Sequence, residues 1–151
     1  MDTLGNKGSV GVSMRIHETR LCFVCSHFAA DTDKLEKRNS DYRATKMRLK
    51  FIDEAKQAAV ALSGLDEEQY KFDLDDHDAI FWFGDLNYRV DKMSITDSFK
   101  HIYANNFDYL IKYDQLSSER EMRRVFEDYQ EGKIDFKPTY KFLIKSGAYE
   151  K

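Results

Sequence analysis

A run of five apolar residues from Ala79 to Phe83 constrains the fold of this chain more than any other feature of its sequence. Polar residues 75–78 precede the run, and Gly84 ends it. Its length and composition are typical of a β-strand that is buried on both faces. Asp85 and Asn87 follow the glycine, so we expect them at the end of the strand, where layered folds usually place ligand sites.

The chemistry of Asp85 and Asn87 suits hydrolysis of a phosphorylated substrate. An ionised aspartate can take a proton from water, and an asparagine amide offers both a donor and an acceptor to a phosphoryl oxygen. Gly-Asp-x-Asn is also a common turn composition, because Asp and Asn side chains bond to the neighbouring backbone. The pattern by itself leaves open both a catalytic rim and an ordinary turn.

The first part of the chain predicts a β-hairpin. Small or polar residues alternate between residues 9 and 16 with four apolar ones, which predicts a strand with one buried apolar face: Val10, Val12, Met14 and Ile16. A second apolar segment, Leu21 to Cys25, follows the polar residues 17–20, which we expect to form a four-residue connection.

His27 follows the second apolar segment directly, in the way that Asp85 follows its own. We therefore expect His27 at the same rim, although a single histidine is more often a structural residue. The other histidines have weaker claims, because His17 lies in the predicted turn, His77 in an acidic loop and His101 in a helical stretch.

Composition excludes several classes of protein. The formal net charge is −3, which argues against broad nucleic-acid binding and requires a local cluster of Lys and Arg for any anionic substrate. The two cysteines, Cys22 and Cys25, are three apart in a predicted strand, so they point to opposite faces and cannot share a metal. We expect both to be core thiols, consistent with a reducing cytosol. No apolar run approaches the about 20 residues that a membrane helix needs, so we expect a soluble protein.

The remaining segments predict mostly helices. From Asp33 to about Leu62 the composition favours one long or two consecutive helices, capped by Asp31 or Thr32, with Arg38 and Asn39 on the solvated face.

Further along, three more patterns follow. We expect a helix capped by Ser94, with a further turn or two around residues 107–111. A second helix should begin near Ser117 and carry Met122, Val125, Phe126 and Tyr129, followed by a turn that ends at Gly132. Two short extended pieces should lie around Pro138. Strands flanked by helices indicate an α/β or α+β fold.

Several blocks in this order closely resemble the inositol polyphosphate 5-phosphatase family: Gly5-Asn6-Lys7-Gly8, Ser26-His27, Arg38-Asn39, Trp82 to Arg89, Asp114-Gln115-Leu116 and Phe136 to Phe142. The resemblance implies a DNase I-like four-layered α/β sandwich. It also implies Mg²⁺-dependent removal of the 5-phosphate from phosphoinositides or soluble inositol polyphosphates, by a cytoplasmic enzyme at the cytosolic face of membranes. Some segments are most similar to SHIP-type phosphatases and others to synaptojanin, so the subfamily stays open.

The resemblance also implies roles for individual residues. Asp85 would help to activate the attacking water, Asn87 would hold that water and the phosphate, and His27 would contact the scissile phosphate. Arg89 would brace the loop. Phosphoryl transfer depends on positioning and on neutralising phosphoryl oxygens, which amide, imidazole and metal groups do well.

Residues for the other phosphates are implied in the same way. The resemblance places Thr139, Tyr140 and Lys141 at the 4-phosphate, and Asn6 with Lys7 at the 1-phosphate. Lysine suits such a place as a mobile point charge, and tyrosine supplies a hydroxyl donor.

Two motifs of the family do not occur in residues 1–151: an upstream segment with a metal-binding glutamate, and a downstream Trp-Cys/Thr-Asp-Arg motif with a later histidine. We therefore expect residues 1–151 to be the central portion of one catalytic domain, inactive in isolation, with the metal ligands of this chain left unassigned. The alternative is a catalytically inactive module that binds phosphoinositides or a protein partner. A nuclease is disfavoured, since it would need a basic groove.

Overall fold

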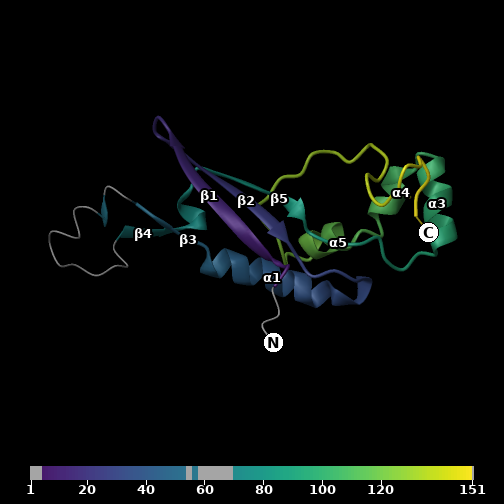
Figure 1. Ribbon diagram of the computed structural model, residues 1–151, viewed down its shortest axis with the longest axis horizontal. Helices are drawn as coiled ribbons and strands as arrows, with labels where there is room; N and C mark the ends of the chain where they lie inside the picture. The colour runs from purple at the N-terminus through teal and green to yellow at the C-terminus, as the bar shows by residue number, and fades with distance from the viewer. Residues whose placement is uncertain (1–4, 54–55, 58–69, 151) are drawn as a thin grey trace. The chain divides into compact units, whose positions relative to one another are not determined.

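The computed structural model describes residues 5–53, 56–57 and 70–150. They form two compact units, and the boundary lies between Asn87, in the first unit, and Tyr88, in the second. The first unit contains β1 (Gly8–Ile16), β2 (Thr19–His27), the 3-10 turn η1 (Thr32–Lys34), α1 (Leu35–Arg48), β3 (Lys50–Ile52), β4 (Lys71–Asp73), the 3-10 turn η3 (Leu74–Asp76) and β5 (Ala79–Asp85) (Figure 1). The second contains α3 (Ile95–Tyr103), α4 (Phe107–Ile111) and α5 (Gln115–Glu121). The α/β class is confirmed.

The main sheet has the order β1-β2-β5. β1 and β2 form the predicted antiparallel hairpin, whereas β2 and β5 are parallel, with a register from Leu21 opposite Ala79 to His27 opposite Asp85. The hairpin connection is shorter than the four residues predicted, because pairing continues until only His17 and Glu18 remain between the strands. His17 takes a left-handed conformation there, with φ of 52°.

The inward face of β1 is the opposite of the one we predicted. Val10 and Ile16 are 69% and 52% exposed, and Val12 and Met14 are also exposed. The inward row is made of small residues, and a Cβ on Gly11 would lie only 2.6 Å from Leu49 Cδ2. Small side chains on this row let Leu49, at the end of α1, approach the sheet closely.

β5 is buried on one face only, which corrects the prediction of burial on both faces. Ile80 and Trp82 pack against a core of Cys22, Val24 and Leu74. On the other face Phe81 and Phe83 are 49% and 50% exposed, and Phe81 stacks on Phe23 with ring centroids 5.0 Å apart. The reason is the alternation of side chains along an edge strand whose only pairing partner in the described residues is β2.

The same alternation of side chains determines the burial of the two cysteines. Cys22 is fully buried, and Cys25 is exposed on the face that carries Phe23 and Phe83. Both are free thiols, as predicted, but the expectation that Cys25 is buried is wrong. Three residues along a strand reverse the direction of the side chain, so one core face cannot hold both.

Helix α1 is shorter than predicted, since its C-cap Leu49 is extended and the short strand β3 follows, which pairs with β4. Residues 54–55 and 58–69 of the predicted helical stretch lie outside the described residues. Asp31 precedes η1 without a capping hydrogen bond from its side chain, and the residue before α1 is Lys34, so neither predicted cap acts as one.

Arg38 and Asn39 are fully buried, which corrects their assignment to a solvated face. Arg38 Nη1 donates to the carbonyls of Ala29 at 3.1 Å and Asp31 at 2.5 Å, and Nη2 donates to that of Thr32 at 3.3 Å. The rigid fork of a guanidinium suits such convergent acceptors. Arg38 therefore holds the loop that follows β2.

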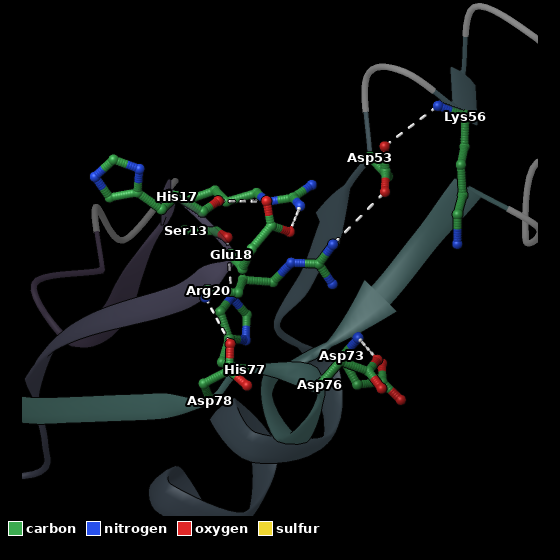
Figure 2. A network of polar contacts seen from close by, with 11 residues as sticks. Ser13, His17, Glu18, Arg20, Asp53, Lys56, Asp73, Asp76, His77 and Asp78 are labelled. Carbon is green, nitrogen blue, oxygen red and sulfur yellow. Dashed lines mark hydrogen bonds and ion pairs between the residues drawn. The ribbon is translucent and has the colours of Figure 1, made fainter.

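A polar network ties the hairpin turn to the acidic segment before β5 (Figure 2). Arg20 N donates to Asp78 Oδ2 at 2.6 Å, and the Arg20 guanidinium lies 3.7 Å from Asp53 and 4.3 Å from the centre of the Phe72 ring. His77 is buried and bonds to Leu74 O at 2.8 Å and to Ser13 Oγ at 2.9 Å. His77 is thus a structural residue.

The second unit matches the predictions at its start. Ser94 caps α3 by accepting a hydrogen bond from Asp97 N at 3.0 Å. The cap of α5, however, is Asp114, which accepts from Ser117 N at 2.8 Å, so that helix begins earlier than predicted. It also ends earlier, because Arg123 and Phe126 adopt positive φ of 54° and 49°.

The end of the second unit is irregular. Around Pro138 the described residues form no strand, only an isolated bridge between Phe142 and Tyr149, and the predicted helical turn at Gly132 is not formed. Tyr149 Oη donates to Pro138 O at 2.6 Å and anchors this segment. Within the described ranges, no helix is both long and apolar enough to cross a lipid bilayer.

We expect iodoacetamide to alkylate Cys25 readily and Cys22 only after unfolding. Burial raises the pKa of the Cys22 thiol, so little reactive thiolate forms there at about pH 8, the range in which an exposed thiol begins to ionise. Mass spectrometry of the native and the denatured protein measures the difference, with Cys25→Ser as the control. Equal rates of labelling at both thiols in the native protein would contradict the assigned faces.

Candidate functional site

Three polar side chains from three strand ends meet at one end of the main sheet. The parallel register places His27 directly opposite Asp85, with 3.5 Å between His27 Nε2 and Asp85 Oδ2. On the other side of β2, Gly8 pairs with His27, and Lys7 before it forms a hydrogen bond from Nζ to His27 Nε2. The structure thus brings together two predicted catalytic residues and one predicted substrate-binding residue.

The backbone at Gly84 allows the strands to come this close. Gly84 has φ of +125°, and a Cβ there would lie 2.2 Å from the carbonyl oxygen of Ser26, its partner on β2. No other residue type fits both the conformation and the space. Pairing then continues past the glycine, since Phe28 N donates to Asp85 O at 3.1 Å.

Asn87 is fixed at the same rim by its own conformation and by its side chain. Its φ is 59°, a left-handed conformation that asparagine tolerates better than most residues. Its Nδ2 donates to Phe28 O at 3.1 Å. The turn containing Asp85 and Asn87 therefore holds Phe28, the residue next to His27, through both its N–H and its carbonyl.

The contact between Lys7 and His27 joins two polar side chains of the rim. An ammonium group has only donors, so it can donate to a ring nitrogen or to a phosphate oxygen. Asp85 lies too far from Nε2 for a strong hydrogen bond but close enough to interact electrostatically. An ammonium, an imidazole and a carboxylate together can bind a phosphate and orient a water.

A chain of hydrogen bonds supports these strand ends from below. Trp82 Nε1 donates to Ser26 Oγ at 2.9 Å, Ser26 and Ser9 hydroxyls lie 2.7 Å apart, and Ser9 and Thr45 hydroxyls 2.8 Å apart. Thr45 Oγ1 then donates to Asp41 O at 2.8 Å. Our sequence analysis missed this support. Its signal is the small hydroxyl residues at inward positions of otherwise apolar strands.

Gln115 is a second residue whose structural role the sequence patterns did not predict. In the second unit it is buried, donates from its N–H to Arg89 O at 2.9 Å and accepts from Arg89 N at Oε1 over 3.1 Å. Its Nε2 also donates to Asp91 at 3.3 Å. It thereby fixes the backbone that follows the Asp85 turn, and its only sequence signal was the Asp114-Gln115-Leu116 block.

The remaining predicted binding residues are exposed. Asn6 lies just before β1 in the first unit, and Thr139, Tyr140 and Lys141 lie in the irregular end of the second. Lys141 forms an ion pair with Glu150, and this hydrogen-bonded carboxylate raises the pKa of the Lys141 ammonium. Lys141 is therefore positively charged at neutral pH.

The described residues offer no clustered set of metal ligands. Among the described residues, no group of three or more His, Cys, Asp or Glu side chains could hold a metal ion. Asp85 and Asn87 carry the hard oxygen atoms that Mg²⁺ and Ca²⁺ prefer, so they fit as part of a shell that substrate oxygens and waters complete.

Comparison with known families decides the membership of this chain. The sequence pattern of the endonuclease/exonuclease/phosphatase family 2 matches residues 1–151. The chain belongs to this family. The DNase I-like α/β fold expected from the sequence is thereby confirmed.

Similar proteins in this family include several inositol polyphosphate 5-phosphatases. The chain is 35% identical to synaptojanin-2 of Rattus norvegicus over 97% of its own length, and 39% identical to type I inositol polyphosphate 5-phosphatase 1 of Arabidopsis thaliana over 99%. It spans only 9% and 24% of those two proteins, respectively. The resemblance inferred from the sequence blocks is confirmed.

Two kinds of solved structure are similar to this chain: a 5-phosphatase domain, in agreement with the sequence comparison, and a nitrophorin. The inositol polyphosphate 5-phosphatase domain of SPsynaptojanin, in complex with inositol (1,4)-bisphosphate and calcium ion, is 33% identical with a TM-score of 0.78, over 97% of this chain and 38% of that one. A Cimex nitrophorin, solved as a ferrous NO complex, is 28% identical with a TM-score of 0.63, over 95% of this chain and 43% of that one.

Replacing Gly84 by alanine should destabilise the protein by about 3 kcal/mol or more, because the Cβ would meet a backbone oxygen in a left-handed conformation. Gly132→Ala is the matched control, since a Cβ there meets nothing within 4 Å. Urea unfolding measures both. If the two substitutions change the free energy of unfolding equally, the close approach of β5 to β2 at this point is wrong.

Proposed function

We propose that residues 1–151 form the central portion of a catalytic domain that removes the 5-phosphate from phosphoinositides, such as phosphatidylinositol 4,5-bisphosphate or 3,4,5-trisphosphate, or from soluble inositol polyphosphates. The observation that carries this proposal is the register that sets His27 beside Asp85 and Lys7 at one rim. Identity to several 5-phosphatases, and the inositol bisphosphate bound by the SPsynaptojanin domain, support the class of substrate.

In this proposal the three rim residues divide the work. The Asp85 carboxylate orients the attacking water and accepts its proton, while the Asn87 amide, held by Phe28, positions the water and the phosphate. His27, with Lys7 beside it, contacts the scissile phosphate. Such fixed donors stabilise charge that develops in the transition state.

A divalent cation, Mg²⁺ in our proposal, fits beside Asp85 and Asn87. Bound there with a phosphate, it would supply Lewis-acid stabilisation of the phosphoryl oxygens. The calcium ion in the SPsynaptojanin complex supports a divalent cation in this kind of domain.

Exposed residues of each unit are assigned to the other phosphates of the substrate. We assign Asn6 and Lys7 to the 1-phosphate and Thr139, Tyr140 and Lys141 to the 4-phosphate. The 1-phosphate of a phosphoinositide is the one attached to the lipid, so this assignment implies action at a membrane surface. We further propose that the enzyme is cytoplasmic and peripheral to the membrane.

The exposed sheet face supports the proposal that these residues are one portion of a larger domain. Val10 and Val12 on β1 and Phe81 and Phe83 on β5 expose roughly half or more of their side chains, on one face of the sheet and on either side of β2. Soluble proteins rarely expose apolar patches of this extent. A second sheet over this face is the arrangement that a DNase I-like sandwich would give.

A second candidate is a catalytically inactive module that binds phosphoinositides or a protein. The similarity to Cimex nitrophorin supports this second candidate, because that protein of similar fold was solved as a ferrous NO complex. A shared fold does not establish a shared reaction. The two candidates differ in turnover, whereas both predict binding.

A chimera tests the catalytic assignment. Residues 1–151 would replace the matched segment of the SPsynaptojanin domain, and phosphate release from a short-chain 4,5-bisphosphate lipid would be measured with Mg²⁺. We expect Asp85→Asn and Asn87→Ala each to lower kcat by about 100-fold or more, because each removes a positioned group. Residues 1–151 alone should show no measurable turnover.

The matched control in this chimera is Asp135→Asn, which removes the same charge from an exposed position. It should leave kcat unchanged. Unaltered turnover in Asp85→Asn would remove Asp85 from the mechanism, and an inactive parent chimera that still binds the lipid would favour the binding module.

Lys141→Ala in the same chimera should weaken substrates with a 4-phosphate more than those without one. The lost charge-assisted contact is worth about 1.5–3 kcal/mol in kcat/KM. Lys133→Ala, which removes an exposed lysine elsewhere in the second unit, is the control. Equal losses for both kinds of substrate would give Lys141 a structural role instead.

A further inference from the structure

A pocket of about 420 Å³ lies in the first unit between the start of β1, the residues that follow β2 and one face of α1. Lys7 lines it together with Phe28, and α1 contributes residues spaced by three or four, among them Lys37, Asp41 and Arg48. This spacing places them on one stripe of the helix. The volume falls within the range of small-molecule sites, roughly 300–1,000 Å³.

The charges around this pocket are predominantly positive. Three of its lining residues, Lys7, Lys37 and Arg48, are cations, and Asp41 is the only carboxylate among the described residues that line it. The chain as a whole carries a net charge of −3, so the pocket opposes the overall sign. A local positive field in an acidic protein concentrates anions.

The single carboxylate is already engaged. Asp41 Oδ1 pairs with Lys37 Nζ, and Oδ2 accepts a hydrogen bond from Ala29 N at 3.0 Å. The Arg48 guanidinium, in contrast, has no ion pair or side-chain hydrogen bond with any residue in the described ranges. Arg48 and the remaining donor capacity of Lys7 and Lys37 can therefore meet an external anion.

The hydroxyl groups on the floor of the pocket bond to neighbouring protein groups and have no proton left to donate to a ligand. Thr45 donates to Asp41 O, so its hydroxyl can only accept from Ser9, and the Ser9 proton is in turn committed to Thr45. Apolar contributions come from Phe28, Ala44 and Leu49. The site thus combines an apolar floor with a cationic rim, which suits an organic anion with a phosphate group.

We propose that this pocket is a second anion site, which binds a phosphate-bearing ligand through Lys37 and Arg48 on α1 and shares Lys7 with the rim of His27, Asp85 and Asn87. The proposal does not depend on the chemistry at that rim. Because Lys7 also bonds to His27 Nε2, an anion in the pocket competes with His27 for the Lys7 ammonium.

Titration of the whole protein with inorganic pyrophosphate, in buffer with EDTA to exclude metal-bridged binding, tests this site. Backbone amide signals of Ala44 and Thr45 should shift in the NMR spectrum. Lys37→Gln combined with Arg48→Gln should weaken the dissociation constant by about ten-fold, as expected for two partly solvated charged contacts.

The matched control removes two positive charges from other positions of the same helix, Arg43→Gln with Lys46→Gln, which do not line the pocket. It should leave pyrophosphate binding within about two-fold of the unaltered protein, because exposed charges at a distance are screened. Equal weakening in both double variants, or no shift at Ala44 and Thr45, would overturn the proposal.

Phosphatidylcholine vesicles with and without phosphatidylinositol 4,5-bisphosphate separate the two sources of such a phosphate. If the Lys37 and Arg48 variant also loses lipid-dependent sedimentation, the ligand is a membrane headgroup. If it loses only pyrophosphate binding, the ligand is a soluble phosphate. Both readouts measure binding and not turnover, so failure of the proposed phosphatase activity would not alter the result.

Discussion

The parallel pairing of β2 with β5 is the constraint on which the rest of this structure depends. It sets His27 opposite Asp85, and it requires glycine at position 84, where the backbone of β5 approaches the Ser26 carbonyl. A shift of one residue would move Trp82 off the core face and Asp85 away from His27. Core packing and the arrangement of the rim are therefore decided by the same register.

Side-chain size explains how the first unit is covered. The inward face of β1 carries Ser9, Gly11 and Ser13, which let α1 and Leu49 pack closely and which take part in hydrogen bonds to Thr45 and His77. The apolar residues of β1 consequently lie on the opposite face with Phe81 and Phe83. A helix on one face and an apolar, exposed surface on the other are what one layer of a multilayered α/β fold presents.

Sequence patterns could predict the strands, the hairpin and the rim, because apolar runs and a following glycine report directly on local structure. They could not predict which face of β1 is inward, since the alternation shows that the two faces differ but not which of them packs against α1. Arg38 was assigned to solvent because charged residues usually are, whereas three convergent carbonyls offset the cost of burying it. The strand at residues 50–52 depends on pairing with residues 71–73, which local composition does not encode.

The central claim is that His27 and Asp85 act as one site, and a double-mutant cycle on kcat/KM in the SPsynaptojanin chimera tests it most directly. His27→Ala and Asp85→Asn should each lower kcat/KM by about 100-fold or more. Since the two residues act on the same phosphate, the double variant should lose no more than about ten-fold beyond the larger single loss. A double variant whose loss equals the product of the two single losses would contradict the account.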